Sequence, residues 1–170
     1  EKEDAYPLAK ALLNGGIDVI EVTYRSEHAT SAIQTISEKL PDMLVGAGTV
    51  LSVEQAKEAI EAGAKFIITP GFNTKVVQWC LDHDVEVYPG VSTASEVEMA
   101  LSMGLTQLKF FPAESSGGAK KLKDLSAPYA NVHFMPTGGI NTKNMHDYLS
   151  LPNVEAIGGS FMLPNDLVVA

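Results

Sequence analysis

Short apolar runs rich in β-branched residues alternate along the chain with longer stretches in which apolar residues recur every three to four positions. Gly, Pro, Ser or Thr separates the two kinds of segment, as is usual between strands and helices. Because the short runs are apolar on both faces, they favour central strands of a parallel sheet. We expect seven strands, over residues 17–24, 43–50, 65–71, 85–91, 106–113, 132–139 and 154–161.

Two of the intervening stretches carry clear helix-start signals. Residues 52–63 open with Ser52 and Gln55, and residues 93–104 open with Thr93 and Glu96, which is the spacing of a capping box. Both stretches close on a glycine, as helices commonly do. We also expect residues 3–16 to form the first helix.

Regular β/α alternation is compatible with a closed (β/α)₈ barrel or with an open doubly wound sheet. Glycine placement favours the barrel, because no G-x-G-x-x-G follows the first strand, whereas Gly-Gly pairs end the last two. We therefore predict an α/β TIM (β/α)₈ barrel as a single domain over residues 1–170. If the last pair follows the eighth strand, the barrel lacks its first strand and its final helix, and is incomplete at both ends.

The charge balance narrows the range of partners. With 12 basic and 21 acidic residues, the formal net charge of −9 opposes broad attraction to nucleic acid or to anionic membranes, so neither is expected as a partner. No segment reaches the run of about 20 apolar residues that spans a membrane, and the acidic start does not resemble a signal peptide. We expect a cytoplasmic protein.

Cysteine and histidine usage suggests neither disulfides nor metal. Cys80 is the only cysteine, so no disulfide can form within the chain, and we expect a buried thiol. The four histidines are scattered without the paired spacing of metal ligands, so no metal site is expected.

Charged side chains lie within strands that should be apolar, where a desolvated charge is costly. Period-two alternation places Glu21, Thr23 and Arg25 on one face of the first strand, and Lys109 with Phe111 on one face of another. Catalytic groups of barrels point inward from the carboxyl ends of strands, so these positions indicate an active-site mouth. An internal salt bridge between Lys109 and Glu21 remains an alternative.

Other strand ends add small or polar groups, namely Thr49, Pro70, Ser92, Thr137 and Ser160. Each alone is more typical of a turn than of a ligand site. Together with the two Gly-Gly turns, which can direct free backbone N–H groups at a phosphate, they favour an anion site at the same mouth.

The runs EVTYRS, VGAGTV, ITPG, PGVST, KFFPAE, PTGGI and IGGS follow one another over nearly the whole chain. In this order and spacing they resemble the 2-keto-3-deoxy-6-phosphogluconate (KDPG) aldolase family, which also includes 4-hydroxy-2-oxoglutarate (KHG) aldolase activity. The resemblance implies a class I, metal-independent aldolase that needs no cofactor and that assembles as a homotrimer.

The resemblance also implies roles for particular residues. Lys109 would form the Schiff base and Glu21 would transfer protons. Contacts to the substrate would come from Arg25, Thr49, Pro70, Phe111 and Thr137, and the phosphate cradle from Gly138, Gly139, Gly159 and Ser160.

The substrate implied is KDPG, which would be cleaved to pyruvate and glyceraldehyde 3-phosphate. Cleavage of KHG to pyruvate and glyoxylate is a related possibility. Preference for the 6-phosphogalactonate epimer is a first alternative. An inactive barrel remnant that binds phosphometabolites is a second, because truncated ends would leave strand edges unpaired.

Overall fold

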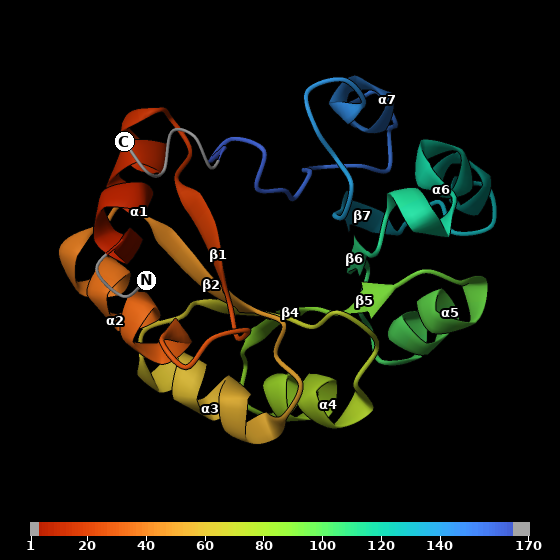
Figure 1. The fold of residues 1–170 in the computed structure, drawn as a ribbon. Helices are drawn as coiled ribbons and strands as arrows, with labels where there is room; N and C mark the ends of the chain where they lie inside the picture. The colour runs from red at the N-terminus through yellow and green to blue at the C-terminus, as the bar shows by residue number, and fades with distance from the viewer. Residues whose placement is uncertain (1–3, 165–170) are drawn as a thin grey trace. The chain divides into compact units, whose positions relative to one another are not determined.

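The computed structural model describes residues 4–164, which divide into two compact units between Tyr88 and Pro89. In each unit, parallel strands alternate with helices, as the sequence pattern predicts (Figure 1). The prediction of one domain over residues 1–170 stays a prediction. None of the helices in the described part of the chain has the length and apolar run needed to cross a membrane.

The first unit has a four-stranded parallel sheet in the order β1-β2-β3-β4. Its helices lie along one side of this sheet (Figure 1). Within the described residues no strand precedes α1. The elements are α1 (Ala5–Asn14), β1 (Val19–Thr23), α2 (Ala29–Lys39), β2 (Leu44–Gly48), α3 (Val53–Glu61), β3 (Phe66–Ile68), α4 (Thr74–Asp82) and β4 (Glu86–Tyr88).

The register of this sheet decides which side chains share a face. Glu21 lies opposite Gly46, and Gly46 lies opposite Phe66, so all three residues share one face. The ring of Phe66 covers Gly46 so closely that any side chain at Gly46 would overlap it. Alternation turns Val45 and Ala47 to the other face, where both are buried. The sheet therefore separates an aliphatic face from a face that carries a carboxylate.

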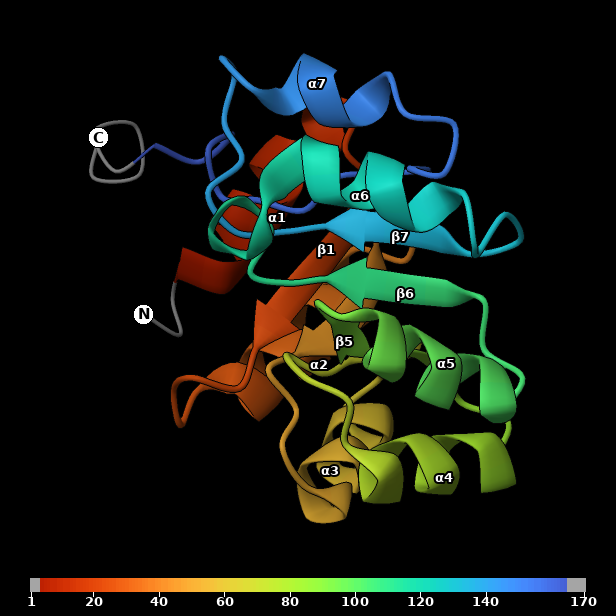
Figure 2. The same cartoon turned by 90° about the vertical axis from the view of Figure 1, so that its right-hand side faces the viewer.

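The second unit has a three-stranded parallel sheet in the order β5-β6-β7. Figure 2 shows α5 and α6 covering one face of this sheet. The elements are β5 (Gly90–Val91), α5 (Ala94–Ser102), β6 (Gln107–Phe110), the 3₁₀ helix η2 (Glu114–Ser116), α6 (Gly118–Ser126), β7 (His133–Pro136) and α7 (Met145–Leu149).

The second sheet has the same division between its faces. Leu108 lies opposite Phe134, and Phe110 follows on the same face, so the rings of Phe110 and Phe134 meet edge to face at 6.3 Å. All three side chains are buried. Lys109 points to the opposite face, between Gly90 of β5 and Met135 of β7.

Two predicted strands differ from the structure. The segment 85–91 is interrupted at Pro89, because proline has no N–H to donate to a ladder. The segment 154–161 forms only two isolated parallel bridges to the β7 segment, at Val154 and Gly158. Glycine weakens a strand, and here the continuous ladder predicted for 154–161 is wrong.

The predicted helix starts are confirmed. The Ser52 hydroxyl caps α3 by accepting from the backbone N–H of Gln55 at 3.2 Å. Thr93 and Glu96 form a complete capping box at the start of α5. Cys80 is buried on α4, and burial raises the pKa of its thiol to about 11. This cysteine therefore behaves as a packing residue.

The capping box makes one part of the stability depend on pH. Partial burial raises the pKa of Glu96, but hydrogen bonds from Ser92 and Thr93 outweigh it, so the pKa lies below its ordinary value of 4.5. A carboxylate with a lowered pKa stabilises the fold above its unfolded-state pKa. That contribution is lost as the pH falls through the folded-state pKa.

We expect Glu96→Gln to lower the free energy of unfolding at pH 7 by about 0.5 kcal/mol, because glutamine keeps an oxygen acceptor for the capping box but loses the charge that interacts favourably with the helix N-terminus. The difference should shrink as the pH falls below 4.5. Urea unfolding followed by circular dichroism at pH 7 and pH 3.5 measures it, with Glu61→Gln as a control for loss of a surface charge. A difference that does not change with pH would contradict this account.

Candidate active site

Lys109 is the charged side chain buried deepest in a strand of the described chain, with 5% of its surface exposed. The ladders of β6 with both neighbours hold its backbone, and its N–H donates to the carbonyl of Pro89 at 3.0 Å. Its Nζ lies 5.1 Å from the centre of the Phe111 ring. The structure therefore places the amine against an aromatic face near the carboxyl end of β6, as predicted for both residues.

Thr137 is on the same face as Lys109, because it follows Met135 by two residues and Met135 pairs with Lys109. Its backbone is held on both sides, since its N–H donates to Phe110 and its carbonyl accepts from Ala113. Its hydroxyl oxygen is buried and has no hydrogen-bond partner within the described residues. Leaving a buried hydroxyl unpaired is costly, which marks Thr137 as a candidate functional residue.

The turns after β7 and near residue 158 lie next to each other. Gly138 and Gly139 both have positive φ angles, 103° and 80°, which glycine adopts at no steric cost. Thr137 pairs with Gly158, and any side chain at Gly158 would overlap the Thr137 hydroxyl. Gly159 comes close to the turn as well, because a Cβ added to it would lie 3.7 Å from the carbonyl oxygen of Ile140.

The backbone of these turns offers donors to solvent. Among residues 4–164, the N–H groups of Gly138, Gly139, Gly159 and Ser160 donate to no acceptor of the chain. Gly159 and Ser160 are exposed. Positive φ angles and unused N–H groups are the features of anion-binding backbone nests. The second unit thus carries seven of the predicted site residues at strand ends and turns, namely Lys109, Phe111, Thr137, Gly138, Gly139, Gly159 and Ser160. Ser92, which the sequence also indicated, instead donates to the Glu96 carboxylate of the capping box.

Glu21 lies on β1, directly over a glycine of the neighbouring strand. A Cβ at Gly48 would overlap the Glu21 carboxyl group. The absence of a side chain at Gly48 therefore makes the space in which the carboxylate lies. A sequence motif alone did not indicate this relation, because the two residues are 27 positions apart and meet only through the parallel pairing of β1 and β2.

Arg25 and Thr49 lie at the carboxyl ends of β1 and β2. The Arg25 side chain is exposed, and its Nε donates to the Thr23 hydroxyl at 3.4 Å. Thr49 has a φ angle of 54°, a left-handed conformation that is rare for a β-branched residue. Such strain costs about 1–3 kcal/mol and clusters at functional sites. The strained residue is one to which the family resemblance assigns a substrate contact.

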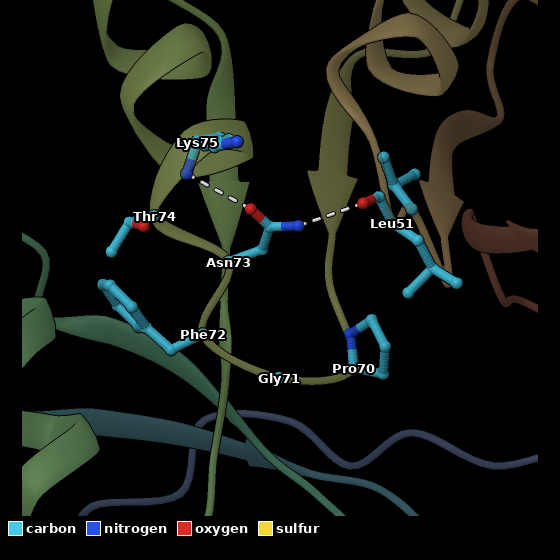
Figure 3. A pocket seen from close by; sticks show the side chains of 8 residues that line it. Leu51, Pro70, Gly71, Phe72, Asn73, Thr74 and Lys75 are labelled. Carbon is cyan, nitrogen blue, oxygen red and sulfur yellow. Dashed lines mark hydrogen bonds between the residues drawn. The ribbon is translucent and has the colours of Figure 1, made fainter.

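Pro70 lines an open pocket of about 550 Å³ at the carboxyl ends of β2 and β3 (Figure 3). Asn73 forms part of its wall and bridges two segments, since its side chain accepts from the backbone of Lys75 and donates to the Leu51 carbonyl at 3.0 Å. Asn73 is not among the predicted site residues, although an asparagine before a helical stretch is a helix-cap signal. The first unit thus carries the other four predicted residues at the ends of its strands.

No three His, Cys, Asp or Glu side chains of residues 4–164 form a group suited to a metal ion. The predictions that the protein uses no metal and no cofactor stay predictions.

Known proteins resemble this chain over nearly its whole length. The family model described as KDPG and KHG aldolase matches residues 1–170. The 2-dehydro-3-deoxy-phosphogluconate aldolase of Treponema pallidum is 49% identical over 168 residues, which cover 99% of this chain and 80% of the relative.

Solved structures are also similar to this chain. The KDPG aldolase of Legionella pneumophila, with pyruvate captured as a covalent carbinolamine intermediate, is 43% identical with a TM-score of 0.96, over 99% of this chain and 82% of that one. A cube-shaped protein cage, designed by fusing symmetric oligomeric domains, is 27% identical with a TM-score of 0.83 over 92% of this chain and 59% of that one. The predicted fold class, a TIM-barrel-type α/β fold, is confirmed. The chain belongs to the KDPG and KHG aldolase family.

Proposed function

We propose that this protein is a class I aldolase that cleaves KDPG to pyruvate and glyceraldehyde 3-phosphate through a Schiff base on Lys109. The observation that carries the proposal is the Lys109 amine itself, buried in β6 within the KFFPAE run. A relative that is 43% identical holds pyruvate as a covalent carbinolamine, an intermediate on the way to a Schiff base. Family membership supports the same substrate.

An amine accelerates this cleavage because it converts the substrate ketone into an iminium ion, which is the stronger electron acceptor of the two. The Lys109 Nζ adds to the C2 carbonyl of the substrate, and the resulting carbinolamine loses water to give an iminium ion. The iminium withdraws electrons from the neighbouring C3–C4 bond. When the C4 hydroxyl loses its proton, this bond breaks, and glyceraldehyde 3-phosphate leaves.

Glu21 is the proposed acceptor of the C4 hydroxyl proton. The electrons of the broken bond remain on C3 as an enamine, and a proton returned by the same carboxyl group converts it to the iminium of pyruvate. Addition of water then releases pyruvate and restores the Lys109 amine. The cycle uses only water and protons beyond the substrate itself.

The remaining predicted residues suit the rest of the substrate. A guanidinium recognises carboxylates, so we assign the keto-acid end to Arg25 and Thr49. Phe111 and Pro70 provide apolar surface, and the unpaired Thr137 hydroxyl is a hydrogen-bond partner for the reacting part of the substrate. The phosphate is assigned to the N–H groups of the glycine turns, at Gly138, Gly139, Gly159 and Ser160.

KHG is the second candidate substrate, because the matching family model covers both aldolase activities. KHG has no phosphate, so it needs Lys109 and Glu21 but not the glycine turns. Comparing kcat/KM for KDPG, its C4 epimer and KHG decides the preference. A ratio that strongly favours KHG would make the phosphorylated substrate secondary.

Reaction of the protein with pyruvate and borohydride tests the proposed nucleophile. Borohydride reduces an iminium to a stable amine, so we expect one modified residue, Lys109, in peptide mass spectrometry. Lys109→Arg keeps the charge but cannot form the imine, and it should give neither an adduct nor cleavage. An adduct confined to another lysine would refute the assignment.

The role of Glu21 in proton transfer can be tested by replacing Glu21 itself and by replacing Gly48, which leaves room for its carboxyl group. Glu21→Gln should still trap pyruvate but lose cleavage by about 10²- to 10⁴-fold, which is the usual contribution of a general acid–base group. Gly48→Ala should also lose cleavage, because its Cβ would displace the Glu21 carboxyl group. Gly15→Ala, at the end of α1, is the control, since its φ angle of −81° suits alanine and its Cβ would lie 3.3 Å from the Leu12 carbonyl oxygen, a tight contact but not an overlap. Unchanged cleavage in Gly48→Ala would separate Glu21 from proton transfer.

We further propose a homotrimeric, cytoplasmic protein. The use of a related structure in a cage built from symmetric oligomeric domains supports an oligomer. Light scattering coupled to size-exclusion chromatography should therefore give three times the chain mass of 18.1 kDa. A monomeric mass at micromolar concentration would contradict the trimer and leave the aldolase proposal unaffected.

A further inference from the structure

Two backbone N–H groups of the segment that follows β6 donate hydrogen bonds to carbonyls of the turn over residues 137–140. The carbonyl of Thr137 accepts from the N–H of Ala113 at 2.8 Å. The carbonyl of Gly138 accepts from the N–H of Glu114 at 3.1 Å. Two consecutive peptide planes of the turn are therefore fixed by the loop that continues from the Lys109 strand.

The next carbonyl of the turn is held by side chains. Gly139 accepts from the amide of Asn144 at 3.1 Å and from the amide of Asn141 at 3.3 Å. The Asn144 amide is itself held in place, because its oxygen accepts from the Asn141 backbone at 2.8 Å. Three consecutive carbonyls of the turn thus have donors.

Fixing these carbonyls also fixes the direction of the N–H groups. In a trans peptide the carbonyl and the N–H point in opposite directions, so the N–H groups of Gly138, Gly139 and Ile140 point away from the donors. Within residues 4–164, none of the three donates to an acceptor of the chain. Several N–H groups held in fixed directions favour binding of an anion, because little ordering remains to be done when it binds.

The Glu114 side chain is held in turn by a buried tyrosine. The Tyr148 hydroxyl donates to Glu114 Oε1, and Tyr148 is 1% exposed on α7. Burial, followed by the hydrogen bond to Glu114, raises the pKa of Tyr148, so its hydroxyl remains a donor at neutral pH. The Glu114 Cγ also occupies the space beside Gly139, 2.6 Å from where a Cβ would be.

We propose that Asn144 and the Tyr148–Glu114 pair are positioning residues that hold the 137–140 turn so that its N–H groups bind the substrate phosphate. The inference rests on the proposed function for the identity of the anion. Asn144, Tyr148 and the Glu114 side chain act indirectly, by holding the backbone whose N–H groups contact the phosphate. Their effect should appear only when the substrate carries a phosphate.

Three variants test the inference. Asn144→Ala removes a donor to the Gly139 carbonyl, and Tyr148→Phe removes the hydroxyl that holds Glu114. We expect each to raise KM for KDPG by about fivefold, in line with one lost hydrogen bond, with little change in kcat. Glu114→Gln keeps an oxygen acceptor for Tyr148 and should stay near the wild-type value. Thr142→Ala, an exposed neighbour in the same loop, is the matched control.

Two further measurements separate positioning from general damage. Cleavage of KHG and borohydride trapping of pyruvate on Lys109 should stay within about twofold of wild type, because neither involves the phosphate. Equal losses on KDPG and KHG, or no loss on KDPG, would overturn the inference. Because Tyr148 is buried, Asn144→Ala provides the answer if Tyr148→Phe fails to fold.

Binding of inorganic phosphate tests the positioning role without requiring that the protein cleave a substrate. Titration followed by ³¹P NMR should show weaker phosphate binding by Asn144→Ala than by wild type. If the wild type cleaves neither substrate, the proposed function fails, whereas weaker phosphate binding by the variant still supports the positioning role. Equal affinity of the two proteins, or no phosphate binding by the wild type, would overturn it.

Discussion

The burial of a lysine side chain on a central strand of a parallel β-sheet is the constraint on which the arrangement of residues in the second unit depends. Moving a charged or polar group out of water costs free energy unless neighbouring groups compensate for it. The ladders to β5 and β7 prevent the Lys109 backbone from moving outward, and the Phe111 ring covers the amine. The same strand continues into the loop whose N–H groups hold the turn after β7. Placement of the amine and placement of the turn are thus linked through one segment of chain.

In each of the two units, a glycine leaves the space that a neighbouring polar side chain occupies. Gly48 leaves room for the Glu21 carboxyl group, Gly158 leaves room for the Thr137 hydroxyl, and Gly139 leaves room for the Glu114 stem. In each pair the glycine and its neighbour are distant in sequence. Parallel pairing and loop packing bring them together, so a substitution at the glycine acts on the partner.

Local signals allowed much of the fold to be predicted from the sequence. Short apolar runs predicted the strands, and the caps at Ser52 and Thr93 predicted two helix starts. Strand patterning and helix capping both depend on residues only a few positions apart in the sequence. The prediction failed where proline or glycine weakens strand pairing within an apolar run. Pro89 interrupts one strand, and the segment 154–161 pairs only at isolated bridges.

The sequence by itself determined the α/β class, the family and the charged residues that are out of place in apolar strands, since these depend on residue type and local order. Only the tertiary structure decided what supports them. Asn144 and Tyr148 are ordinary polar and aromatic residues in sequence, and the partner of Tyr148 lies 34 positions away. The strained φ angle of Thr49 likewise follows from how β2 ends, because backbone strain is set by the surrounding packing and not by the identity of the residue.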